Sequence, residues 1–184
     1  MLEGIAAADS VNIRKNISRN GGEAIAAFCT RLSFAAKIYV YGQAHCAAAA
    51  AYLSSYLRFL MQNVCCLNQT GEEPLFAASD IDSGDLLLVI SFPVHSESTR
   101  RLVSYARDRG AAVAVISESM DSEIAQQADA VLVCECGDFG VNGSMAPVIS
   151  LCGSIVCLLA RNDEKAQKRL RAAGEAIYYR GEQA

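Results

Sequence analysis

The stretch DLLLVISFPVHSEST, residues 85 to 99, decides the fold class of this chain. Its first half is a continuous apolar run, typical of a strand that is buried on both faces of a parallel sheet. Its second half changes to hydroxyl side chains around a histidine, directly before a helix that we expect to begin near Ser96 and to end at Gly110. A strand that leads into hydroxyls and then into a helix is a common way to build an anion site.

Strands and helices alternate on both sides of this stretch. Further strands are expected at residues 37–42, 63–68, 111–117 and 129–135. Helical spacing predicts helices at residues 46–60, 121–128 and 144–160, and the polar stretch 69–85 predicts a connection with a single turn of helix. Such alternation implies parallel strands joined by right-handed crossovers. We therefore predict a three-layer α/β/α fold with a doubly wound five-stranded parallel sheet.

The two ends of the chain are predicted to be helical. Residues 1–36 form an N-terminal helical segment, in which a clear helix follows cap-like residues 20–23 and a looser helix precedes them. The looser helix is expected to pack on a neighbour or on a second subunit. Residues 163–184 form a charged helical tail. No internal repeat or linker divides the sequence, so we expect a single domain over residues 1–184.

Composition excludes several classes of function. The chain has 184 residues, a formal net charge of −4 and a pI near 5.2, so it lacks the basic surface for direct nucleic-acid binding by this chain alone. Two uncharged stretches, 38–57 and 139–160, approach the width of a bilayer, but glycine and polar residues interrupt both. We interpret them as buried elements with no membrane role, and we expect a cytoplasmic protein.

Cysteine usage points to buried, reduced thiols. The eight cysteines lie mostly in apolar segments, and no secretory signal precedes them. A zinc site built from Cys134, Cys136, Cys46 and the histidines is a weaker interpretation, because one residue separates the first two rather than the two of a zinc knuckle. The adjacent Cys65 and Cys66 are expected to fill both faces of a strand. No metal and no cofactor are expected.

The candidate ligand site lies in the loops that follow the strands, because open α/β sheets bind ligands at the carboxyl ends of their strands. Backbone N–H groups at helix starts and nearby hydroxyls suit a phosphate group. The expected ligand-binding residues are Gly42, Gln43, Ala44, His45, Cys46, Ser91, His95, Ser96, Thr99 and Ser117. Both histidines of the chain fall in these loops, which favours contact between at least one of them and the ligand. No catalytic residue is assigned.

The order of four motifs resembles the sugar isomerase (SIS) domain, and most closely the effector-binding SIS domain of RpiR-type transcriptional regulators. The motifs are IYVYGQAHCA (38–47), DLLLVISFPVHSEST (85–99), ARDRGAAVAVISESMDSEIAQQADAVLVCE (106–135) and NGSMAPVISLCGSIV (142–156). VNIRKNI (11–17) is similar to the segment before that domain in the regulators, so the resemblance covers almost the whole chain. It implies the flavodoxin-like strand order 2-1-3-4-5, a homodimer or homotetramer, and a phosphosugar bound between strands one and three.

Two loops depart from the pattern of the resembled family. The family loop after the first strand reads Gly-x-Gly-x-Ser, and its positions here are Gly42, Ala44 and Cys46. The family loop after the third strand reads Ser-x-Ser-Gly-x-Thr, and the corresponding residues here are Ser91, Pro93, Val94 and Ser96. The Ser-Phe-Pro form of this loop recurs in the regulators and favours a sensor over an enzyme.

The resemblance therefore implies a non-catalytic sensor of a sugar phosphate or an amino-sugar phosphate, as in an RpiR-like regulator. In those regulators a helix-turn-helix domain precedes this one and reads DNA, and no such domain is expected within this chain. The alternative function is an aldose-ketose phosphosugar isomerase, which needs a base near the substrate. The candidate bases are His45, His95 and Glu135.

Overall fold

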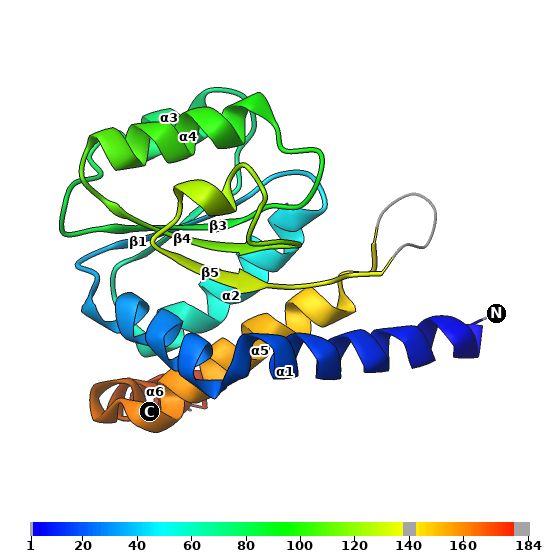
Figure 1. The fold of residues 1–184 in the computed structure, drawn as a ribbon. Coiled ribbons are helices and arrows are strands. Elements are labelled where there is room, and N and C mark those ends of the chain that lie inside the picture. The colour runs from blue at the N-terminus through cyan, green and yellow to red at the C-terminus, as the bar shows by residue number, and fades with distance from the viewer. Residues whose placement is uncertain (1, 138–142, 179–184) are drawn as a thin grey trace.

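The computed structural model describes residues 2–137 and 143–178, and its centre is a five-stranded parallel sheet (Figure 1). The strands are β1 (Ile38–Gly42), β2 (Val64–Leu67), β3 (Leu86–Ile90), β4 (Ala112–Ser117) and β5 (Ala130–Val133). Their order across the sheet is β2-β1-β3-β4-β5. Both the predicted parallel sheet and the predicted strand order are confirmed.

Strand β3 lies in the middle of the sheet because every one of its side chains is apolar and buried. It pairs with β1 on one side, where Gly42 lies opposite Ile90, and with β4 on the other. The chain order reverses between β1 and β3, since β2 continues outward from β1 and β4 continues outward from β3. The carboxyl ends of β1 and β3 therefore meet at the position where doubly wound sheets bind their ligands.

Helices cover both faces of the sheet (Figure 1). They are α1 (Leu2–Phe34), α2 (Cys46–Leu60), α3 (Glu73–Ala77), α4 (Glu97–Asp108), α5 (Ala146–Asn162) and α6 (Glu164–Ile177). Alternate residues of each strand enter two separate cores: Val40 and Leu88 pack with residues of α1, α2 and α5, whereas Tyr39 and Leu87 pack with residues of α4. These two cores make the three predicted α/β/α layers.

Helix α1 consists of two helical stretches that meet at a kink, in agreement with the two helices expected for this segment. It runs from Leu2 to Phe34 and is broken at Gly21, whose φ of 69° and ψ of 164° are not helical. Glycine accepts a positive φ without the clash that a Cβ would cause. The cap-like residues 20–23 thus mark a kink within a longer helix.

The first half of α1 is fixed to the edge of the sheet by two asparagines. Asn16 Nδ2 donates to the carbonyl of Glu135 at 2.9 Å, and Asn16 Oδ1 accepts from the N–H of Glu135 at 2.8 Å. Asn20 makes the same pair of bonds with Val133, at 2.7 and 2.8 Å. Residues four apart on a helix and two apart on a strand span nearly equal lengths, about 6 Å. The two side-chain amides therefore bind backbone groups at the outer edge of β5, as a sixth strand would.

The segment after β4 is not the helix expected at residues 121–128. It contains turns and a single 3₁₀ turn, Ala125–Gln127. The hydroxyl of Ser122 accepts from the N–H of Ala125, and that of Ser119 accepts from the N–H of Asp121. The Ser122 bond has the pattern of an N-cap, and the extended backbone of Ala128, two residues before β5, leaves room for only this one turn.

The C-terminal end of the described chain is helical, as predicted. Helix α6 matches the predicted tail up to Ile177, and residues 179–184 lie outside the described residues.

All eight cysteines are free: four are buried, three are half-buried and Cys157 is exposed. Within the described residues no single helix is long and apolar enough to cross a membrane, and only α5 and α6 taken together, bent by 105°, pass that test.

Candidate functional site

The loop after β1 is a tight turn into helix α2. A Cβ atom on Gly42 would lie 2.5 Å from the carbonyl oxygen of Cys46, so this position has no room for a side chain. Ala44 has a φ of 53°, the left-handed conformation that glycine adopts without strain. Ala44 occupies the second glycine position of the resembled loop, and its φ is one that glycine accepts more readily than alanine. Glycine at residue 42 and a left-handed residue at 44 together allow the tight turn between β1 and α2.

The loop after β3 ends in the N-cap of helix α4. Ser96 Oγ accepts from the N–H of Thr99 at 3.1 Å and lies 2.9 Å from Thr99 Oγ1. The Ser96 hydroxyl also donates to Oε1 of Gln43, which belongs to the loop after β1. Ser96 thus starts the helix and joins the two loops, as its position before a helical pattern suggests.

Between these two loops lies a cavity of about 240 Å³ at the carboxyl ends of β1 and β3. Its lining residues are Gln43, Ala44, His45, Cys46, Ile90, Ser91, Phe92, Val94, Ser96 and Thr99. Most of the residues predicted from the sequence are therefore brought together. Helices α2 and α4 both begin at this cavity, and helix starts attract negative charge.

Three predicted residues lie outside the lining. Gly42 supports the turn beneath it. His95 lies behind Ser91, with its Nδ1 atom 2.8 Å from Ser91 Oγ. Ser117 is completely buried, and its hydroxyl donates to Glu118 Oε2 at 2.7 Å and lies 2.9 Å from Ser122 Oγ.

The electrostatics of the cavity rest on neutral groups. No lysine or arginine is among its lining residues in the described part of the chain. Burial raises the pKa of the Cys46 thiol to about 11, so this thiol stays protonated at neutral pH. Burial also raises the pKa of Tyr41, whose hydroxyl is near Thr99 and Ser96. Any anion here would be held by hydroxyl and N–H groups rather than by a fixed positive charge.

The sequence did not predict Glu118 as part of the site. Its Oε1 atom lies 3.8 Å from His95 Nε2, so the carboxylate, the imidazole and the Ser91 hydroxyl follow one another. Its position directly after β4 was the available signal, because the loop after that strand lies at the same edge of the sheet. The apolar residues Ile90, Phe92 and Val94 were also missed as lining residues.

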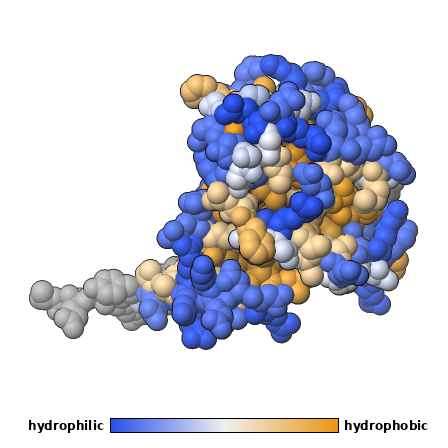
Figure 2. Space-filling view, turned by 60° about the vertical axis from the view of Figure 1, so that its left-hand side comes forward, coloured by the Kyte–Doolittle hydropathy of each residue, from blue (hydrophilic) through white to orange (hydrophobic). Residues whose placement is uncertain are grey.

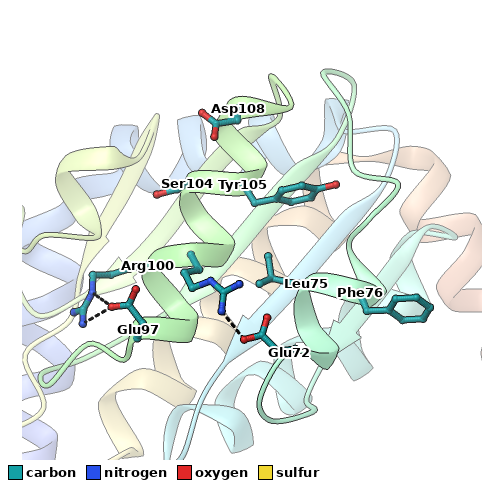
Figure 3. Close-up of a pocket in the computed structure, with 9 residues that line it drawn as sticks. Glu72, Leu75, Phe76, Glu97, Arg100, Ser104, Tyr105 and Asp108 are labelled. Carbon is teal, nitrogen blue, oxygen red and sulfur yellow. Dashed lines mark hydrogen bonds and ion pairs between the residues drawn. The ribbon is translucent and has the colours of Figure 1, made fainter.

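A larger hollow of about 660 Å³ lies elsewhere, between α3 and α4 on the outside of the molecule (Figure 3). Four of its charged side chains are already paired: Arg101 with Glu72, and Arg100 with Glu97. It is open to solvent, and Phe76 beside it is 82 % exposed. The smaller cavity, where helix starts and hydroxyls converge, is therefore the candidate functional site. In residues 2–137 and 143–178 no group of histidine, cysteine or acidic side chains is arranged to hold a metal ion.

Solved structures share this fold. The sugar isomerase domain of an RpiR transcription factor from Sphaerobacter thermophilus has a TM-score of 0.87 at 23 % identity and covers 95 % of this chain and 98 % of its own. The NanR protein of Vibrio vulnificus, complexed with ManNAc-6P, has a TM-score of 0.84 at 15 % identity, with coverage of 96 % and 68 %. A Methanococcus jannaschii protein, whose structure infers a 3-hexulose-6-phosphate isomerase function, has a TM-score of 0.70 at 16 % identity, with coverage of 88 % and 94 %.

Sequence comparison identifies the family directly. No curated protein matches the chain. The family model of the SIS domain matches residues 31–137, which is more than half of the 184 residues. This range contains all five strands and both loops of the cavity. The chain belongs to the SIS domain family.

Proposed function

We propose that this SIS domain binds a sugar phosphate or an amino-sugar phosphate in the cavity between β1 and β3, and that it works as the non-catalytic effector sensor of an RpiR-like regulator. One observation carries the proposal: Ser91, Ser96 and Thr99 line a cavity at which two helices begin. Hydroxyls and helix N-termini are suited to the phosphate oxygens, and the lining apolar residues can contact the sugar carbons.

The structural neighbours support this choice of ligand and role. One neighbour is the sugar isomerase domain of an RpiR transcription factor, and another, NanR, forms a complex with ManNAc-6P. At identities of 23 % and 15 % these proteins share the fold, and the ligand of this chain remains our proposal. Ligand binding in such a sensor would favour one arrangement of its subunits over another.

A thermal-shift screen tests the proposal. Sugar phosphates should raise the melting temperature, whereas the same sugars without phosphate should have little effect, because a ligand that binds only the folded state stabilises it. Inorganic phosphate serves as the second control. Equal shifts with the phosphorylated and unphosphorylated forms of a sugar would contradict the proposed anion site.

An aldose-ketose isomerase is the second candidate, and one observation favours it. His95 is hydrogen-bonded to Ser91 and near Glu118, which is a suitable arrangement for a base. Two observations favour the sensor instead. His95 does not line the cavity. Hydrogen bonding to Lys15 and the nearby charge of Arg19 lower the pKa of Glu135, which makes this carboxylate a weaker base. An isomerase assay on any ligand from the screen separates the two functions, and turnover that is lost in His95→Ala would establish the enzyme.

We also propose that the domain over residues 1–184 forms a homodimer or homotetramer in the cytoplasm and does not itself bind nucleic acid. Figure 2 shows apolar residues gathered across the middle of one face, bordered by hydrophilic ones. Large apolar side chains such as Phe34 and Tyr56 are 85 % and 45 % exposed. Light scattering after size exclusion should give a mass of two or four times 19.6 kDa, and a monomer would contradict this part of the proposal.

A further inference from the structure

His95 lies between two oxygen-bearing side chains from the ends of neighbouring strands. Its Nδ1 atom is 2.8 Å from Ser91 Oγ after β3, and its Nε2 atom is 3.8 Å from Glu118 Oε1 after β4. The imidazole side chain is only 10 % exposed, whereas that of Glu118 is 30 % exposed. The hydroxyl that lines the cavity is therefore connected, through one imidazole, to a carboxylate beyond the cavity wall.

The carboxylate, 3.8 Å from Nε2, favours one of the two tautomers of the neutral imidazole. A carboxylate only accepts hydrogen bonds, so Glu118 favours a hydrogen on the facing Nε2. The other nitrogen, Nδ1, then accepts, and the Ser91 hydroxyl must donate to it. In this state the hydrogen of Ser91 is directed away from the cavity and only its lone pairs are available. A dianionic phosphate presents acceptors alone, so it gains no hydrogen bond from Ser91.

Protonation of His95 reverses the hydrogen bond. Both ring nitrogens now donate, so Ser91 accepts from Nδ1–H and its own hydrogen is free to bond a phosphate oxygen. The imidazolium also adds a positive charge beside a cavity that, in the described part of the chain, has no lysine or arginine in its lining. Glu118 compensates this charge from the opposite side of the ring. Only the protonated state thus offers the anion both a donor and an opposite charge.

We propose that Glu118 is a positioning residue that acts through His95 on the Ser91 hydroxyl, and that the site takes up a proton when it binds the phosphate group of its ligand. This inference rests on the proposed function and adds a regulation of the same site. Imidazole exchanges its proton between about pH 5 and 8, so the affinity for the anion should fall as pH rises through that range. For one proton taken up, the fall approaches about tenfold per pH unit.

Other charged groups around His95 do not account for such a change. The Arg100 guanidinium on α4 donates to the backbone carbonyl of His95 at 2.8 Å and pairs with Glu97 and Glu123, and arginine stays charged throughout this range. Cys46 on α2 is influenced by the charge of Glu118, but its pKa of about 11 keeps it neutral. His45 lines the same cavity and is present in the wild type and in every variant of His95 or Glu118, so a comparison among these proteins isolates the contribution of His95.

Isothermal titration calorimetry measures the proton directly. A sugar phosphate is titrated near pH 7 in two buffers of different ionisation enthalpy, and the difference in binding enthalpy gives the number of protons taken up. The wild type should take up a substantial fraction of one proton more than His95→Gln and Glu118→Gln. The ligand's own protonation cancels, because the same ligand is used throughout. Glu123→Gln, which removes an acid that pairs with Arg100 rather than His95, should behave as the wild type.

The pH profile of affinity gives the second readout. His95→Gln should lose the dependence that exceeds the ligand's own titration, and Glu118→Gln should shift it to lower pH, because the imidazolium loses its counter-charge. Glu118 is 30 % exposed, so its variant keeps the test valid if the histidine variant fails to fold. Equal proton uptake in the wild type and the folded variants would overturn this inference alone. A wild type that binds no sugar phosphate would overturn the proposed function and this inference with it.

Discussion

The two hollows of this molecule use their polar groups in opposite ways. In the larger one, about 660 Å³ between α3 and α4, exposed side chains neutralise each other, as Arg101 and Glu72 do. In the smaller one, about 240 Å³, two strand ends and two helix starts converge, and its hydroxyls come from the loops that join them. The larger hollow is formed by the outer sides of α3 and α4, whereas the smaller cavity is formed where β1 and β3 lead into the helices that follow them.

This difference shows that volume is a poor guide to function in this fold. A hollow between helix flanks presents side chains whose charges are screened by water and already paired. The junction between β1 and β3 presents backbone groups that the sheet topology places together in every doubly wound domain. Four substitutions test this contrast between the two hollows, and their expected effects decrease from Gly42→Ala to Arg101→Ala.

The largest effect is expected from Gly42→Ala. The new Cβ would lie 2.5 Å from the carbonyl oxygen of Cys46, so the turn between β1 and α2 must move. We expect a loss of about 1 to 3 kcal/mol in the free energy of unfolding, measured by urea denaturation, together with loss of sugar phosphate binding. Gly153→Ala is the matched control, since its Cβ would meet nothing closer than 3.5 Å. If Gly42→Ala bound the sugar phosphate as tightly as the wild type does, the shape of this turn would not determine binding in the cavity.

The next effect is expected from Ser96→Ala, which removes a lining hydroxyl and the N-cap of α4 at once. The lost cap should reduce the free energy of unfolding by about 1 kcal/mol. Loss of the hydroxyl should weaken phosphate binding by a further ~1 to 3 kcal/mol if it contacts the charged group. Asp163→Ala removes the N-cap of α6 away from the cavity, so it should reproduce the change in stability without the change in affinity. Equal affinity in Ser96→Ala and the wild type would exclude Ser96 from the site.

A smaller and opposite effect is expected from Ala44→Gly. The φ of 53° costs a residue with a Cβ about 1 to 2 kcal/mol, and glycine would recover part of this against its own chain entropy. We expect a net gain of about 0.5 to 1 kcal/mol in stability by thermal denaturation. A loss of stability would show that this turn does not hold Ala44 in the left-handed conformation.

Arg101→Ala should have the smallest effect. Its ion pair with Glu72 is exposed on both sides, with side-chain exposures of 51 % and 71 %, so its removal should change stability by less than about 1 kcal/mol. Sugar phosphate affinity, measured by calorimetry, should equal that of the wild type. A clear loss of affinity would indicate that the sugar phosphate binds in the larger hollow instead.

The fold was predictable because its signals are local. The run at residues 86–90 is apolar throughout, which requires burial on both faces, and the alternation of strands and helices around it leaves few topologies. The cavity followed from the same logic, since residues after β1 and β3 must meet. The helix expected at residues 121–128 is reduced to a single turn because Ala128 already has the extended backbone that leads into β5, a boundary that the apolar pattern does not reveal.

Contacts between distant segments were not predictable. Glu118 and His95 are far enough apart in sequence that only the pairing of β3 with β4 brings them together. The role of Asn16 and Asn20 likewise depends on how α1 crosses the sheet edge, although asparagines four residues apart were a visible signal. Side-chain partners at this distance depend on helix orientation, which the periodicity of one helix does not determine.

The asparagines of α1 also bear on how this domain can be shortened. A fragment that begins at residue 31, where the family match begins, would lack Asn16 and Asn20 and would leave the backbone groups of Val133 and Glu135 without these partners. An uncovered strand edge recruits strands from other molecules and leads to aggregation. A recombinant fragment should therefore start upstream of Asn16, well outside the boundary that sequence similarity suggests.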